Sequence, residues 1–173
     1  MRQPRFLQTF VADAAAEQAE ARRALLEPQA RIAPKFFYAR LGSKLFEAIT
    51  ELPEYYPTRT EAKILADHGA AMVQTVGTVG TLLDLGAGNC AKAARLFDAL
   101  QPARYVAVDI PVDFLRSALS ALQRQFPATQ MLGVGLDFSQ SLDLPPQALA
   151  GRPVFFYPGS SIGNFAPDEA LKF

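Results

Sequence analysis

The sequence has almost none of the residues from which disulfide frameworks and metal sites are built. Among its 173 residues there is one cysteine, Cys90, and one histidine, His68. A single cysteine excludes an intrachain disulfide and a multi-cysteine zinc cluster, and a single histidine argues against a histidine-based metal site. We therefore expect no bound metal. We expect Cys90 to act as a small filler and His68 to have no catalytic role.

An excess of charge of one sign and a long apolar run are also missing. Lysine and arginine number 17, as do aspartate and glutamate, so the composition does not indicate nucleic acid or an anionic membrane as a partner. No stretch approaches the roughly 20 apolar residues of a membrane span, and charged residues interrupt the N-terminal region before it resembles a signal peptide. We expect a soluble, cytoplasmic protein without a nucleic-acid or membrane partner.

From residue 77 onward, apolar runs alternate with helical patterns. Half of all residues are hydrophobic and a fifth are charged, which is ordinary for a globular domain. The patterns predict strands at 81–85, 104–110, 130–138 and 152–158, and helices at 91–100, 112–125 and from about 167. Near-continuously apolar strands separated by helices predict an α/β fold with a parallel sheet that is covered on both faces.

The part of the chain before residue 77 predicts helices. Residues 1–33 are rich in Ala, Gln, Glu and Arg, and we expect helix at least over 12–26. A short amphipathic helix follows Gly42. A longer helix then opens at Thr58 and Glu61, which have capping-box spacing.

These patterns divide the chain into two parts. Residues 1–76 are predicted to be an N-terminal helical segment that contributes to the substrate pocket, and 77–173 to be the sheet domain. The chain stops inside the helix that begins near 167, which leaves the last predicted strand at an exposed sheet edge. We therefore expect the sheet domain to be incomplete and the chain to be a fragment of a longer protein.

The stretch LLDLGAGNCAKAARLF, from Leu82 to Phe97, carries the clearest ligand signal. A predicted strand leaves through Gly86 and Gly88, which permit a tight turn and a close approach of the ligand. The start of the following helix favours an anion, and Lys92 adds a positive charge there. A ligand site is expected at this turn, because parallel α/β sheets bind ligands beyond the carboxyl ends of their strands.

Spacing alone fits two kinds of adenosine-containing cofactor. Gly86-Ala-Gly88-Asn-Cys-Ala91 matches the dinucleotide fingerprint, and Asp109 lies near the expected distance of about 20 residues, at the end of the next strand. A carboxylate there accepts hydrogen bonds from ribose hydroxyls, which NAD and S-adenosylmethionine both possess. Asp109 therefore does not distinguish the two.

Two further features favour S-adenosylmethionine. Asp84 precedes the glycines and gives the D-x-G-x-G form that is typical of class I methyltransferases. Asp137 and Phe138, after the third predicted strand, supply an acceptor for the adenine amino group beside an aromatic face. Asp137 also fits an acid that begins a turn at a strand end. An NAD-dependent oxidoreductase and a non-catalytic binding protein with the same kind of sheet remain as alternatives.

Five stretches, taken together, are more specific. KFFYARLGSKLFEAITELPEYYPTRTE, LLDLGAGNCAKA, YVAVDI, LDF and FFYPGSSIGNF occur in this order over about 34–173. They resemble the family of S-adenosylmethionine-dependent histidine Nα-methyltransferases, the trimethylating enzymes of ergothioneine biosynthesis. The resemblance implies a class I, Rossmann-like methyltransferase fold and methyl transfer to the α-amino group of an amino acid, with L-histidine converted to hercynine.

The resemblance also implies roles for individual residues. The residues expected to bind the cofactor, including Gly88 of the glycine turn, are Gly86, Gly88, Lys92, Asp109, Asp137 and Phe138. The residues expected to contact the acceptor are Tyr38, Tyr55 and Asn164, with Asn164 near the α-amino group. No general base is assigned. Family members continue into a further domain that contacts the imidazole, so we expect this chain to be inactive alone.

Overall fold

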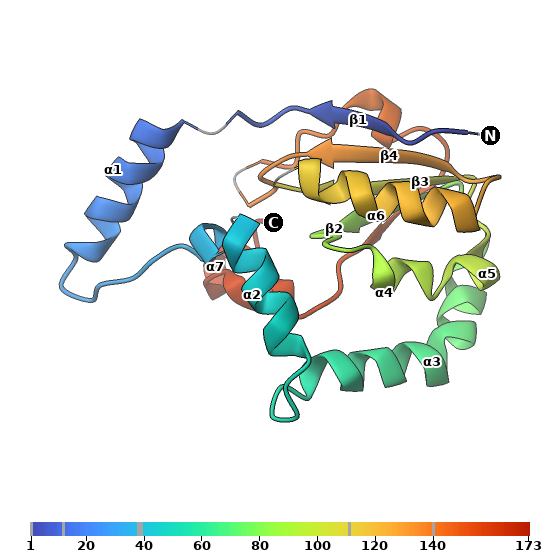
Figure 1. Cartoon of the computed structure of the whole chain (residues 1–173), viewed down its shortest axis with the longest axis horizontal. Helices are drawn as coiled ribbons and strands as arrows, with labels where there is room; N and C mark the ends of the chain where they lie inside the picture. Colours follow the sequence, from blue (N-terminus) through green and yellow to red (C-terminus); the bar gives the residue numbers. More distant parts are fainter. Residues whose placement is uncertain (1, 12, 38–39, 111, 140) are drawn as a thin grey trace.

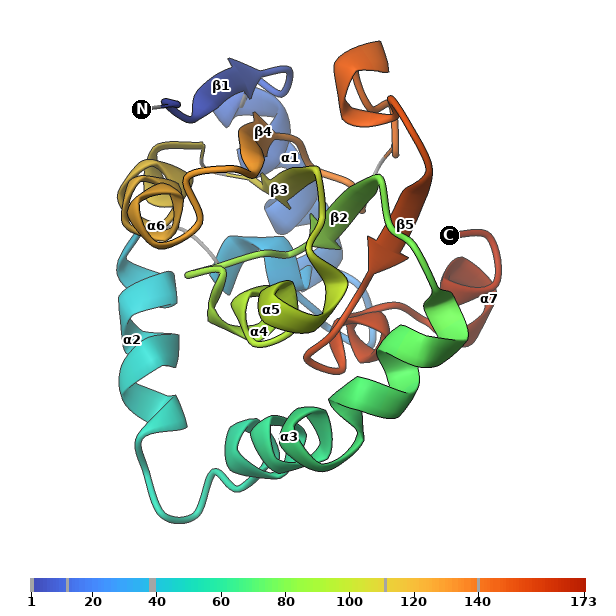
Figure 2. The same cartoon turned by 90° about the vertical axis from the view of Figure 1, so that its right-hand side faces the viewer.

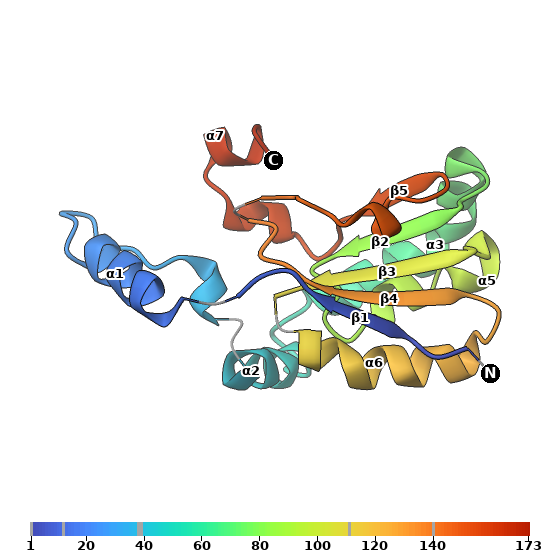
Figure 3. The same cartoon turned by 90° about the horizontal axis from the view of Figure 1, so that it is seen from above.

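A five-stranded parallel sheet forms the centre of the structure, a computed structural model that describes residues 2–11, 13–37, 40–110, 112–139 and 141–173 (Figure 1). The strands are β1 (Arg5–Gln8), β2 (Thr81–Leu85), β3 (Arg104–Asp109), β4 (Gln130–Gly135) and β5 (Pro153–Phe156). They lie in the order β1-β4-β3-β2-β5, which Figure 3 shows from above, and every neighbouring pair is parallel. The predicted α/β fold with a Rossmann-like parallel sheet is confirmed.

Helices precede the sheet and connect its strands. They are α1 (Ala14–Leu25), α2 (Arg40–Thr50), α3 (Pro57–Val76), α4 (Ala91–Ala94), α5 (Phe97–Leu100), α6 (Val112–Gln125) and α7 (Pro167–Ala170). Three short 3-10 turns are η1 (Pro34–Phe37), η2 (Pro146–Ala148) and η3 (Ser161–Asn164). Within the described residues, none of these helices combines the length and the apolar character that crossing a membrane requires.

Apolar side chains bury both faces of the sheet. On the face that α4, α5 and α6 cover (Figure 2), Tyr105 of β3 belongs to the same buried cluster as Leu115 and Leu119 of α6. On the other face, Val106 of β3 packs in a second cluster with Ala148 of η2. Because both faces are covered, the strands are apolar at successive positions, and this explains why they were predicted as parallel.

β1 is the main departure from the predicted secondary structure. Residues 1–33 were expected to be helical, and α1 confirms this for its own span, but Arg5–Gln8 pairs in parallel with β4 at the sheet edge. Phe6 lies beside Gly133, where an added Cβ would stand 2.7 Å from the Phe6 ring. The strand therefore fits into a gap that a glycine leaves on a distant strand, and no local pattern in residues 1–33 indicates it.

Several boundaries differ from the predictions. α2 begins at Arg40, before Gly42 rather than after it, and β5 covers Pro153–Phe156 rather than 152–158. The helix expected over 91–100 is divided into α4 and α5, and β4 ends at Gly135 rather than at 138. The predicted capping box is wrong: α3 begins at Pro57 with Tyr56 at its N-cap, and no side chain caps it. Proline at the first helical position already lacks the N–H that a cap would satisfy. The division of the chain at residue 76 stays a prediction, although β1 joins the first part to the sheet.

The docking of β1 can be tested at Phe6, which packs against the core and lies 4.6 Å beneath the Arg116 guanidinium. Phe6→Ala should lower the free energy of unfolding by about 1–2 kcal/mol, because a partly buried ring is lost from the edge of the core. Urea denaturation followed by circular dichroism measures this. Val11→Ala is the control, since Val11 is 84% exposed and should change stability little. Equal effects of the two substitutions would contradict the docking of β1.

Candidate functional site

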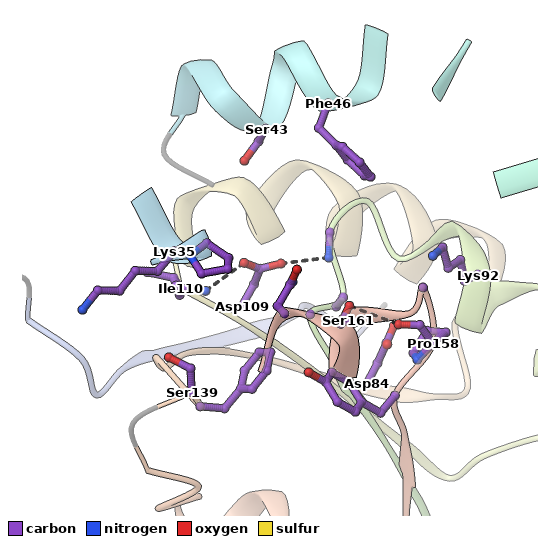
Figure 4. Close-up of a pocket in the computed structure, with 18 of the residues that line it drawn as sticks. Lys35, Ser43, Phe46, Asp84, Lys92, Asp109, Ile110, Ser139, Pro158 and Ser161 are labelled. Carbon is purple, nitrogen blue, oxygen red and sulfur yellow. Dashed lines mark hydrogen bonds between the residues drawn. The ribbon is translucent and has the colours of Figure 1, made fainter. Parts of the chain in front are cut away.

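A cavity of about 860 Å³ lies at the carboxyl ends of β2, β3 and β5 (Figure 4). Its lining includes the turn after β2, the ends of β3 and β4, and the loop after β5. The N-terminal part of the chain also contributes, through Ser43 and Phe46 of α2 and through Glu61 and Leu65 of α3. Between β2 and β5 the strand order reverses its direction of growth, and this is the place where open parallel α/β sheets bind ligands.

The turn after β2 is held open by its glycines. Gly86 has φ +71° and Gly88 has φ +53°, both in the left-handed region. The Gly86 N–H donates to the carbonyl of Val108 at 2.9 Å, which ties the turn to β3. An added Cβ on Gly88 would meet nothing within 4 Å, whereas one on Gly86 would stand 3.6 Å from the Phe138 ring. The turn therefore presents bare backbone toward the cavity, as the sequence predicted.

Asp109 fixes this turn from the end of β3. Its Oδ2 accepts a hydrogen bond from the Gly88 N–H at 2.9 Å, and its Oδ1 accepts one from the Ile110 N–H at 2.8 Å (Figure 4). Burial raises the pKa of Asp109, and these two backbone donors oppose the rise. Each carboxylate oxygen has a further lone pair. Asp109 is thus held in one orientation beside the glycine turn, with acceptor capacity left for hydroxyl groups.

Asp137 and Phe138 follow β4 and line the same cavity. Asp137 is buried, and its Oδ1 accepts hydrogen bonds from the backbone N–H and the hydroxyl of Ser139, at 3.2 and 2.5 Å. This is the turn geometry of an acid at a strand end. The Phe138 ring packs edge-on against Tyr157 at 5.9 Å and lies 6.0 Å from Phe173. Together these aromatic rings form an apolar wall of the cavity.

Lys92, just inside α4, forms an ion pair that the sequence did not indicate. Its Nζ lies 2.6 Å from Oε2 of Glu61 on α3, and Oε1 of Glu61 accepts a hydrogen bond from the Gly159 N–H at 2.5 Å. Glu61 lies in the PEYYPTRTE stretch, but its spacing from Thr58 suggested a helix cap instead. Its contact with Lys92 joins residues far apart in sequence, and the sequence pattern contains no signal for it.

Asp84 lies beneath the turn and is almost fully buried. The Tyr105 hydroxyl donates to its Oδ2 at 2.7 Å, and among the described residues its Oδ1 has no hydrogen-bond partner. Desolvation raises the pKa of Asp84 to about 7, against the lowering effect of the Tyr105 hydrogen bond. Burial likewise raises the pKa of the Cys90 thiol to about 12, so the thiol is neutral, as expected of a small filler.

The structure brings most of the predicted site residues to one cavity. Those that line it are Gly86, Gly88, Lys92, Asp109, Asp137, Phe138 and Asn164. Tyr55 does not line the cavity. Its ring packs edge-on at 5.8 Å against Phe46, which does line the cavity. Tyr38 falls outside the described residues. His68 is exposed on α3 and does not line the cavity. The roles of these residues toward cofactor and acceptor stay predictions.

Sequence reasoning missed several residues of the cavity. Tyr157 and Ser161 lie in the FFYPGSSIGNF stretch, which the resemblance had already marked, whereas Phe173 lies in no motif. The hydroxyl of Ser161 donates to the Pro158 carbonyl at 3.2 Å and shapes the loop after β5 (Figure 4). Tyr157 and Phe173 reach the cavity through the tertiary fold, which packs their rings together at 5.2 Å.

Comparison with known proteins supports the predicted family. A model of the histidine-specific, S-adenosylmethionine-dependent methyltransferases matches residues 17–173. The chain is 38% identical over 170 residues to histidine N-alpha-methyltransferase of Mycolicibacterium smegmatis, over 95% of this chain and 52% of that protein. It is 39% identical over 144 residues to the protein of the same name from Mycobacterium tuberculosis, over 81% of this chain and 44% of that protein.

A fungal protein is also similar. Ergothioneine biosynthesis protein 1 of Neurospora crassa is 32% identical over 142 residues, which cover 79% of this chain and 16% of the fungal protein. The chain spans about half the length of the two mycobacterial relatives.

The raised pKa of Asp84 predicts a pH-dependent change in stability. Its folded pKa of about 7 exceeds its ordinary value of 3.8, so the folded protein retains a proton that the unfolded chain releases between these values. The stability contributed by Asp84 is thus complete below about pH 3.8 and is lost as the pH rises to about 7. The side chain of Asp84→Asn stays neutral at every pH. The free energy of unfolding of this variant, relative to that of the native protein, should therefore rise between about pH 4 and about pH 8, by on the order of 2–4 kcal/mol.

Urea denaturation at both pH values measures this difference. Asp113→Asn is the control, because the Asp113 side chain is 88% exposed in its pair with Arg116. A stability difference between Asp84→Asn and the native protein that does not vary with pH would contradict the assignment.

Proposed function

Because the chain belongs to the family of S-adenosylmethionine-dependent, histidine-specific methyltransferases, we propose that it forms the cofactor-binding part of an N-methyltransferase. The proposed acceptor is the α-amino group of an amino acid, L-histidine, which is trimethylated to hercynine. The observation that carries the proposal is one cavity that joins Gly88 and Asp109 of the cofactor motif to Asn164 of the loop after β5.

The residues of this cavity fit S-adenosylmethionine. Gly88 leaves open space where a side chain would stand, so a ligand can approach the backbone of the turn. Asp109 is oriented by two backbone donors and retains acceptor capacity for ribose hydroxyls. Phe138 offers an aromatic face beside the acid Asp137, which suits an adenine ring and its amino group. Lys92 supplies a positive charge for the carboxylate of the methionine part.

In the proposed reaction the chain aligns the reactants and excludes water. Bound in the cavity, S-adenosylmethionine supplies a methyl group on a sulfonium, which is the electrophile. Asp109 holds the ribose, Asp137 and Phe138 hold the adenine, and Lys92 holds the methionine end, so the methyl group has a fixed direction. Asn164 orients the acceptor amine in line with it.

The acceptor nitrogen must be a free amine to attack. α-Amino groups have pKa values of about 7.7–8.0 in model peptides. The adjacent carboxylate raises this pKa in a free amino acid, so only a minor fraction is neutral near neutral pH without a base. No base is assigned among the predicted residues. His68 is exposed outside the cavity, and the Cys90 thiol is buried and neutral.

Family membership favours this proposal over an NAD-dependent oxidoreductase, which only the glycine spacing supported. A methyl-transfer assay on the longest natural form of the protein distinguishes the proposal from a non-catalytic binding protein, which would transfer no methyl group. The cytoplasmic location and the absence of nucleic-acid and membrane partners are part of the proposal, as is the expectation that this chain alone is inactive.

Isothermal titration calorimetry tests the choice of cofactor. S-adenosylmethionine should bind to the purified chain and NAD should not. Lys92→Ala should weaken S-adenosylmethionine binding by about tenfold, because one charge-assisted contact with the carboxylate is lost. Lys63→Ala is the matched control, since the Lys63 side chain is 76% exposed in its pair with Asp67. Tight NAD binding without any response to S-adenosylmethionine would contradict the proposal.

The acceptor side is tested at Asn164. Titration of L-histidine into the chain saturated with S-adenosylhomocysteine should show weaker binding for Asn164→Ala than for the native protein, by about fivefold to tenfold, because a side-chain hydrogen bond to the amine is lost. Binding of S-adenosylhomocysteine itself should not change. If Asn164→Ala weakened cofactor binding and left histidine binding intact, the predicted role would be wrong.

A further inference from the structure

We propose that Glu61 is a positioning residue, which holds the Lys92 ammonium and the loop after β5 in the arrangement that receives the carboxylate of the cofactor. The inference rests on the proposed function, because it assigns a role in binding the methionine part of the cofactor. It adds a residue of α3 to a cofactor site whose predicted residues all lie in the sheet domain.

The geometry of the Glu61 carboxylate is the first support. Its two oxygens bind two different segments: Oε2 lies 2.6 Å from the Lys92 ammonium on α4, and Oε1 accepts the Gly159 N–H at 2.5 Å. One side chain thus joins α3, the helix after the glycine turn, and the loop that leads to Asn164. All three segments line the same cavity.

The backbone at Gly159 is the second support. Its φ of +82° suits glycine, and an added Cβ would stand only 2.6 Å from the Lys92 ammonium. The loop after β5 therefore passes directly beside the ammonium. Glu61 binds both neighbours at this point, so a shift of its carboxylate would change the position of Lys92 and of the loop together.

Partial burial separates this pair from an ordinary surface ion pair. The side chains of Glu61 and Lys92 are 25% and 39% exposed, whereas those of Asp67 and Lys63, on the same helix, are 47% and 76% exposed. Ion pairs between fully solvated side chains contribute little to stability, because water and salt screen the charges and both side chains lose conformational freedom. The Glu61–Lys92 pair is bound at the wall of a cavity and is supported by a backbone hydrogen bond.

The chemistry of the two groups explains how they would act together. An ammonium has three N–H donors, and Glu61 accepts one of them, which fixes the direction of the others. Lysine has a long and flexible side chain, so an unpaired Lys92 would lose more conformational entropy when it binds an anion. Glu61 reduces this loss by ordering the ammonium before the ligand binds.

Glu61 could also act through charge alone, by repelling a ligand carboxylate, and the two effects have opposite consequences. If charge alone mattered, Glu61→Gln would strengthen binding and Glu61→Asp would leave it near the native value. If positioning dominates, both substitutions weaken binding, because aspartate keeps the charge but is one methylene too short to reach both partners.

The test is calorimetric titration of the full chain with S-adenosylhomocysteine, which carries the carboxylate, and with 5′-methylthioadenosine, which lacks the amino-acid part. Glu61→Asp and Glu61→Gln should each weaken S-adenosylhomocysteine binding by about fivefold to tenfold and leave methylthioadenosine binding unchanged. In the Lys92→Ala background, Glu61→Gln should cause no further loss, because the residue acts through Lys92. Asp67→Asn, which breaks the exposed pair on the same helix, should have no effect.

Each other outcome has a distinct meaning. If the native chain binds S-adenosylhomocysteine and both Glu61 substitutions leave this binding unchanged or strengthen it, the inference about Glu61 is wrong and the proposed function stands. Equal weakening of the binding of both ligands would indicate a general structural role for Glu61. An undiminished effect of Glu61→Gln in the Lys92→Ala background would indicate the same. Either result would overturn the inference. Failure of the native chain to bind S-adenosylhomocysteine would contradict the proposed function itself.

Discussion

The hydrogen bond from the Gly88 N–H to the Asp109 carboxylate is the interaction on which the site depends. It connects the turn after β2 to the end of β3 at 2.9 Å, across 21 positions of sequence. A parallel sheet brings these two ends to the same edge, and the bond fixes the open backbone of the turn relative to the acid. This bond fixes the orientation of Asp109 and the place of the turn in the cavity wall, and Glu61 holds Lys92 from the other side.

Around this bond the chain places groups from both of its parts. The sheet contributes acids at the ends of β2, β3 and β4, and the first part contributes Phe46 and Glu61. The buried Asp84 has a strongly raised pKa because desolvation outweighs its hydrogen bond from Tyr105. Lys92 lies near these carboxyl groups and is paired with Glu61 at 2.6 Å, so the direction of its ammonium affects the electrostatic potential in the cavity.

Much of the fold and of the cofactor side of the cavity could be predicted from the sequence, because the signals are local. Continuous apolar runs predicted four strands, the spacing of the α6 leucines predicted that helix, and the Gly86 and Gly88 turn followed directly from D-x-G-x-G. β1 could not be predicted, since its place depends on the space beside Gly133 on a distant strand. Glu61 was interpreted as a helix cap for the same reason: a capping-box spacing is visible in the sequence, but an ion pair to Lys92 is not.

A crystal structure of the chain with S-adenosylhomocysteine tests the central claim most directly. The account predicts that the ribose hydroxyls lie within hydrogen-bond distance of Asp109, with the backbone of the Gly86–Gly88 turn beside the ligand and the adenine against Phe138. A ligand bound elsewhere on the molecule, with the space beside Gly88 and Asp109 left empty, would contradict it.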